Sequence, residues 1–103
     1  MADRDSIKVH DVSTRLSGKY GNGVLRREVW VDRNGRVVRY NLAYINHEVF
    51  QGDNGRVLGY DNAHGFHHRH FMGVVETIEF SSFEVIEARF ETDWLPFRKR
   101  GKK

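Results

Sequence analysis

The sequence predicts an α+β fold: an antiparallel β-meander of four or five strands with a C-terminal helix packed on one face. Short segments rich in β-branched and aromatic residues follow one another from residue 24, separated by turns that contain Gly and Asn. Near residue 83 the spacing of apolar residues changes from two to three or four. A chain of 103 residues with 39% hydrophobic content is enough for a single domain, 1–103, with one core.

The central hairpin is the clearest local element. Segments 24–31 (VLRREVWV) and 36–45 (RVVRYNLAYI) have the composition of strands. The step Asn34-Gly35 between them tolerates the positive φ angles of a type I′ turn, which we therefore expect. Large residues alternate along the second strand, so its core face is expected to carry Tyr40, Leu42 and Tyr44.

Shorter elements surround this hairpin. The polar N-terminal segment 1–23 is expected to contribute at most a short edge strand, formed around Ile7, Val9 and Val12. A Gly- and Asn-containing turn leads to a strand at 56–60 (RVLGY). Residues 66–72 and 74–80 (VVETIEF) are expected to be extended as well.

The C-terminal helix is expected to begin at Ser81, because Ser81 and Glu84 fit a capping box. Pro96 is expected to limit its end. Apolar residues at helical spacing would form its buried side: Phe83, Ile86, Phe90 and Trp94. The tail 98–103 (RKRGKK) is basic, and we expect it to be disordered.

Charge is distributed unevenly along the chain. Segment 24–39 holds five arginines against two acids, and 76–93 holds six acids against one arginine. The first would suit phosphates and the second a basic partner, although both would also suit solvated faces. There is no Cys, no apolar run of about 18 residues and no signal-like N-terminus. We therefore expect a cytoplasmic protein without a membrane segment.

Segment 64–70 is the densest cluster of reactive groups in the chain. It holds four of the six histidines and one arginine: His64, His67, His68, Arg69 and His70. Imidazoles exchange protons near cellular pH, and a guanidinium binds phosphate. In an extended strand His68 and His70 would share one face, and His67 and Arg69 the other.

Metal-free cleavage of RNA is the leading interpretation of this cluster. It needs a base, an acid and a cation for the charge that develops on phosphorus. We expect His68 and His70 as the proton-transfer pair, Arg69 as the phosphate clamp, Asp61 or His64 as the orienting group, and Tyr60 as a stacking or relay group. Binding of RNA is expected to involve Arg26, Arg27, Arg36, Arg39, His67 and Asn62.

Two other interpretations stay open for the same residues. One is a metal site, with ligands drawn from Asp61, His64, His68 and His70, although an adjacent Arg69 would disfavour a cation on a shared face. The other is structural, with the histidines forming half-exposed, hydrogen-bonded surface. The leading interpretation requires neither a metal nor another cofactor.

Three segments in the middle third of the chain resemble the TumE-type toxins of prokaryotic toxin–antitoxin pairs. They are RYNLAYI at 39–45, RVLGYDNAHG at 56–65, and HHRH at 67–70 followed by Gly73. Members of that family are similarly short and keep a Tyr-Asp-Asn turn before a His-Arg-His triplet. Carried over residue by residue, the motif points to Tyr60, Asp61, Asn62, His64, His68, Arg69 and His70.

The resemblance implies a growth-inhibiting toxin encoded beside an antitoxin that carries a helix-turn-helix DNA-binding domain. It also implies mRNA cleavage or another block of translation. We therefore expect the toxin of a type II pair, with RNA and the antitoxin as partners, and a homodimer is compatible with the sequence. The acidic helix and the basic tail are the expected antitoxin contacts. The alternative is a non-catalytic module that binds nucleic acid or the translation machinery.

Overall fold

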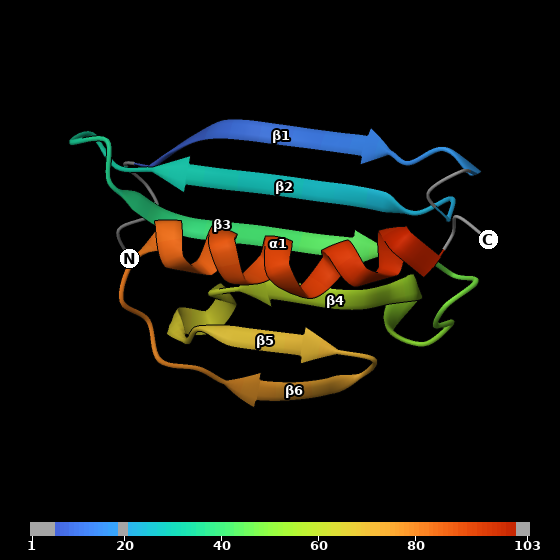
Figure 1. Cartoon of the computed structure of the whole chain (residues 1–103). Coiled ribbons are helices and arrows are strands. Elements are labelled where there is room, and N and C mark those ends of the chain that lie inside the picture. The colour runs from blue at the N-terminus through green and yellow to red at the C-terminus, as the bar shows by residue number, and fades with distance from the viewer. Residues whose placement is uncertain (1–5, 19–20, 101–103) are drawn as a thin grey trace.

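A computed structural model describes residues 6–18 and 21–100, in which a six-stranded antiparallel sheet is covered by one α-helix. The strands are β1 (Ile7–Arg15), β2 (Val24–Val31), β3 (Val37–Ile45), β4 (Arg56–Asp61), β5 (His68–Phe71) and β6 (Val74–Thr77). Each strand pairs with the next along the chain, so the sheet is a meander. Helix α1 (Phe83–Arg100) lies across the middle of one face, over β3 and β4 (Figure 1).

The α+β class and the helix on one face are therefore confirmed, with one or two strands more than expected. The edge strand β1 is also longer than the sequence indicated, since it spans nine residues. Within the described residues, no helix is long and apolar enough to cross a membrane. The predicted basic tail is helical as far as Arg100, and its last three residues lie outside the described part of the chain.

The core lies between α1 and the central strands. As predicted, the buried side of β3 carries Tyr40, Leu42 and Tyr44, and the buried side of α1 carries Phe83, Ile86, Phe90 and Trp94. From β4, Leu58 and Tyr60 complete the contact. Burying a large apolar side chain contributes about 1.5–3 kcal/mol. This layer therefore fixes α1 above β3 and β4 and leaves the other face of the sheet free of it.

The turn between β2 and β3 differs from the prediction. Only Gly35 adopts a positive φ, of 82°, and Asn34 does not. The Asp32 carboxylate accepts hydrogen bonds from the backbone N–H groups of Asn34 and Arg36, and the Gly35 N–H donates to the Asp32 carbonyl. This is a type I turn followed by a left-handed glycine. The type I′ prediction is wrong because the Asp32 side chain satisfies the turn's N–H groups.

Both predicted ends of the helix are also wrong. The Ser82 hydroxyl accepts a hydrogen bond of 3.2 Å from the Val85 N–H, so Ser82 caps the helix and not Ser81. Pro96 lies inside α1, which continues to Arg100. Proline removes one helical hydrogen bond and costs about 3 kcal/mol in a helix interior. Phe97 offsets part of this cost, because its ring packs 5.6 Å from that of Tyr44.

The face of the sheet that α1 does not cover is called the open face below. Two neighbouring rows of paired residues cross its centre. One row is Glu28, Asn41, Asp61 and His68. The next is Arg26, Ala43, Gly59 and His70. Register shifts after Lys8 and between Tyr44 and Ile45 each insert one residue. These β-bulges bring Lys8 and Arg56 onto the open face as well.

Candidate functional site

Asp61, at the end of β4, is the centre of a polar cluster on the open face. One of its carboxylate oxygens accepts a 2.8 Å hydrogen bond from His70 Nε2 and lies 3.6 Å from Nη1 of Arg56. The other accepts a bond from the Ala63 N–H and lies 3.8 Å from His68 Nδ1. The cross-strand pair Asp61–His68 and the diagonal neighbour His70 explain this convergence. A carboxylate, two imidazoles and a guanidinium therefore meet at one place.

The imidazole rings of His68 and His70 differ in their hydrogen bonding and in their exposure. Nε2 of His70 donates to Asp61, and Nδ1 of the same ring is buried without a hydrogen-bond partner among the described residues. His68 is more accessible, with 21% of its side chain exposed against 13% for His70. The arrangement makes His70 a support for Asp61 and His68 the imidazole that can meet a ligand.

Arg69 and Tyr60 lie on the opposite face, towards α1. Nε of Arg69 is 3.2 Å from both the Tyr60 hydroxyl and the Asp93 carboxylate, and the Tyr60 hydroxyl donates a 2.6 Å bond to Asp93. Burial, followed by the bond to Asp93, raises the pKa of Tyr60, so this fully buried hydroxyl keeps its proton. The expected convergence of Arg69 with His68 and His70 is therefore wrong, because strand alternation turns it towards the helix.

Two further residues that were expected to bind RNA instead make contacts that stabilise the fold. The His67 ring stacks on Phe80, with centroids 4.0 Å apart, and forms a 2.8 Å hydrogen bond with the Tyr40 hydroxyl. Burial, and then the charge of His68, lowers the pKa of His67. The Asn62 amide donates to the Val38 carbonyl and accepts from the Tyr40 N–H. Neither His67 nor Asn62 is directed at the cluster around Asp61.

A metal site would need several ligands gathered around one point. In residues 6–18 and 21–100, no group of three or more His, Cys, Asp or Glu side chains is arranged to hold a metal ion. His70 is engaged with Asp61, as described above. The backbone of His64 lies in the short 3-10 turn η4 (Ala63–Gly65), and its side chain is outside the described part of the structure.

Two of the arginines expected to bind RNA lie on the open face. Arg26 forms ion pairs with Asp11 at 2.8 Å and Glu28 at 3.1 Å. The Arg39 guanidinium lies 4.7 Å from the centre of the Trp30 ring. The Lys8 ammonium lies 4.9 Å from the same ring. Both cations therefore lie over the Trp30 ring, which holds them on the open face.

The other two predicted arginines lie elsewhere. Arg27 points to the helix side, where its Nε donates a 2.9 Å bond to Glu87. Arg36 is exposed where the β2–β3 turn enters β3. Since alternate residues of a strand face opposite sides, adjacent Arg26 and Arg27 cannot both serve one surface.

Arg56 was missed as a site residue. Simple alternation separates position 56 from 59 and 61, and only the β-bulge opposite Tyr44 and Ile45 brings it to the open face. Its side chain lies over Gly59, where an added Cβ would be 2.8 Å from the Arg56 Cδ. A glycine inside a strand often marks such a close approach, so Gly59 was the available signal.

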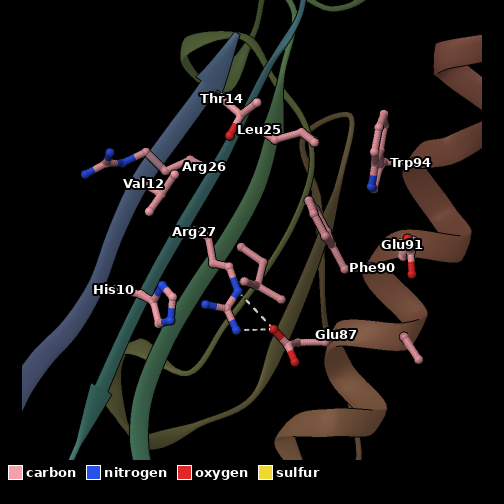
Figure 2. A pocket seen from close by; sticks show the side chains of 12 residues that line it. His10, Val12, Thr14, Leu25, Arg26, Arg27, Glu87, Phe90, Glu91 and Trp94 are labelled. Carbon is pink, nitrogen blue, oxygen red and sulfur yellow. Dashed lines mark hydrogen bonds and ion pairs between the residues drawn. The ribbon is translucent and has the colours of Figure 1, made fainter. Parts of the chain in front are cut away.

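Two hollows adjoin these elements. One, of about 320 Å³, lies on the open face beside the cluster and is bordered by Arg26, Asn41 and Arg56. The other, of about 690 Å³, is a groove on the helix side, between α1 and the first two strands. Figure 2 shows this groove, with Arg27 and Glu87 joined across it and Leu25, Phe90 and Trp94 towards one end.

No protein-family model, curated protein or solved structure matches the chain. The function proposed below therefore depends on the geometry of the open face and on the sequence resemblance of residues 39–73.

Proposed function

We propose that this chain is the toxin of a toxin–antitoxin pair and that it cleaves RNA on the open face of its sheet. The observation that carries the proposal is the cluster of Asp61, His68, His70 and Arg56, which is accessible and lies beside a hollow. It supplies an imidazole, an orienting carboxylate and a cation, the groups that metal-free phosphodiester cleavage needs. The resemblance to TumE-type toxins supports the biological role.

His68 is the proton-transfer group in this mechanism. It takes the proton from a ribose 2′-hydroxyl as that oxygen attacks phosphorus. The bond from phosphorus to the 5′-oxygen then breaks, and the His68 imidazolium returns the proton to the leaving oxygen. The products are a 2′,3′-cyclic phosphate and a free 5′-hydroxyl. Positioned proton transfer of this kind contributes about 10²–10⁴-fold in rate.

The other members of the cluster support His68. Arg56 binds the non-bridging phosphate oxygens and stabilises the charge of the transition state. Asp61 orients the His68 ring. The separation of 3.8 Å is long for a hydrogen bond, and such contacts shorten when substrate binds. His70 holds the Asp61 carboxylate in place.

RNA would lie across the open face. Lys8 and Arg39, which lie over the Trp30 ring, offer two cations to its phosphates. On this face we expect phosphate contacts from Arg39 and from the Arg56 guanidinium beside Asp61. Affinity should then fall as salt concentration rises.

The antitoxin would occupy the groove on the helix side. Strands lie about 4.8 Å apart, so β1 and β2 leave about 10 Å of sheet beside α1. This matches the distance of 8–10 Å, roughly, between packed helices. An amphipathic antitoxin helix would cover Leu25, Phe90 and Trp94, and a basic residue on it would face Glu91 on the wall. Leu25→Asp should therefore weaken neutralisation of the toxin by the product of an adjacent helix-turn-helix gene.

Expression of the chain alone in bacteria tests the proposed activity. Growth should stop with the wild-type chain and with a His10→Ala control, which removes a histidine on the helix side. Growth should continue with His68→Ala. Purified wild-type protein should yield RNA fragments that end in a 2′,3′-cyclic phosphate, without added metal. Equal toxicity of His68→Ala and wild type would refute the role of His68.

A non-catalytic RNA-binding module is the second candidate. The observation that favours it is that His70 Nε2 is bonded to Asp61 while His70 Nδ1 is buried, which leaves His68 without a second accessible imidazole. This candidate predicts salt-dependent RNA binding with no cleavage over hours. The fate of the bound RNA separates it from the toxin nuclease.

A further inference from the structure

The hollow on the open face has the small residue Ala43 in its floor. Ala43 pairs with Gly59 across β3 and β4, and the Arg56 side chain lies over that glycine. Because Ala43 has a short side chain, the sheet surface is depressed between Arg26 and Arg56. The volume of about 320 Å³ is suited to a single nucleotide unit and not to two.

The walls of this hollow carry both donors and acceptors. The guanidinium of Arg56 lies beside the carboxylate of Asp53, and Arg26 and Asn41 also border the hollow. Nε of Arg56 donates a 2.8 Å bond to one Asp53 oxygen, so a guanidinium and a carboxylate edge stand next to each other. The walls therefore present N–H donors adjacent to a carboxylate acceptor.

We infer that this hollow binds the guanine base of the nucleotide whose 2′-hydroxyl attacks the scissile phosphate. Guanine has the acceptors O6 and N7, which arginine recognises, beside the donors N1–H and N2–H, which a carboxylate recognises. Adenine offers arginine only N7 as an acceptor on that edge, and the pyrimidines lack the second ring that would reach across the floor. Arg56 and Asp53 together thus match guanine best, and because a guanidinium carries five N–H donors, the Arg56 Nη1 beside Asp61 can still contact the phosphate.

The position of the hollow agrees with that of the reacting groups. Asn41 borders the hollow and pairs directly with Asp61 on the neighbouring strand. Adjacent strands are about 4.8 Å apart, which is comparable to the distance from a base to its own 3′-phosphate. A guanosine held in the hollow would place its 3′-phosphate over Asp61 and His68. This inference rests on the proposed function, since it assigns that site a base preference.

Titration with the four nucleoside 3′-monophosphates tests the inference. We expect 3′-GMP to shift the ¹³C-methyl signal of Ala43 and to bind at least about tenfold more tightly than the others. Asp53→Asn should lower 3′-GMP affinity by about 5- to 150-fold and 3′-AMP affinity much less. Asp53 has a φ of 51°, which asparagine also tolerates, so this variant keeps the backbone. Glu76→Gln, an exposed acid on β6, is the matched control.

Ala43→Leu provides a second variant that fills the hollow without changing charge. It should abolish the preference for 3′-GMP, and circular dichroism shows whether it folds. If it does not fold, Asp53→Asn still tests whether the hollow prefers guanine. Equal binding of the four nucleotides, or no shift at Ala43, would overturn the guanine subsite even if the wild-type protein cleaves RNA. Selective binding of 3′-GMP at Ala43 without RNA cleavage would instead support the guanine subsite and refute the proposed nuclease activity.

Discussion

Arg56 and Arg69 form a matched pair with opposite expected phenotypes. Both side chains are 24% exposed, and both are held by a carboxylate. Arg56 lies beside Asp61 on the open face, whereas Arg69 ties Tyr60 and Asp93 together under α1. Replacing each by alanine therefore separates a role in catalysis from a role in stability.

The structure sets the size of each effect. Arg69→Ala removes two hydrogen bonds of 3.2 Å, and each is worth about 1 kcal/mol in net stability. Partial exposure screens the ion pair, so we expect a loss of about 1–2 kcal/mol in the free energy of unfolding. For a domain of this size that lowers Tm by about 5–15 °C. Arg56→Ala removes a donor that stabilises the transition state and should lower the cleavage rate by about 10²–10³-fold.

Urea unfolding and RNA cleavage, both measured well below Tm, test the pair. Arg69→Ala should unfold at lower urea and cleave RNA at close to the wild-type rate while folded. Arg56→Ala should lose most of the cleavage rate and less stability than Arg69→Ala, because it removes one exposed hydrogen bond, to Asp53. Arg56→Lys should recover part of the rate because it keeps the charge without the planar fork. If folded Arg69→Ala is as inactive as Arg56→Ala, the assignment of the phosphate clamp to the open face is refuted.

Three further outcomes are expected. Gly59→Ala should reduce RNA cleavage with little loss of secondary structure, because the new Cβ would stand 2.8 Å from the Arg56 Cδ and displace that side chain; unchanged kinetics would contradict this placement. Stability should fall as pH drops below about 6.5, because burial lowers the pKa of His67 in the folded state and the unfolded chain then binds more protons. Urea unfolding of wild type and His67→Phe from pH 7.5 to 5 checks this, and equal pH dependence would exclude His67 as the cause. Pro96→Ala should raise the free energy of unfolding by about 1–2 kcal/mol, since it restores a helical N–H, and no gain would mean that α1 already compensates for the proline.

The sequence anticipated much of the cluster around Asp61 through the alternation of strand residues. It placed His68 and His70 on one face and Arg69 on the other, as the structure does. Asp61 precedes the turn that joins β4 to β5, so antiparallel pairing brings it opposite His68. The prediction failed where it required Arg69 to reach the same ligand as the two histidines, because alternation already excluded that.

The guanidinium that does reach the cluster, that of Arg56, could not be identified from the local sequence pattern. Arg56 faces Asp61 only because one extra residue is inserted opposite the Tyr44–Ile45 step. Such a bulge depends on pairing between strands, and pairing is a property of the assembled sheet. The same holds for Lys8, which a register shift in β1 brings to the face of Trp30.

By itself, the sequence determined the order of the elements, the core side of β3 and the buried stripe of α1, because each follows from a short-range period of two or of 3.6 residues. Tertiary structure decided which face of the sheet α1 covers and which cation joins the histidines. It also decided that α1 continues through Pro96. These outcomes depend on contacts between residues distant in the chain, whose packing energies exceed local preferences of about 1–3 kcal/mol.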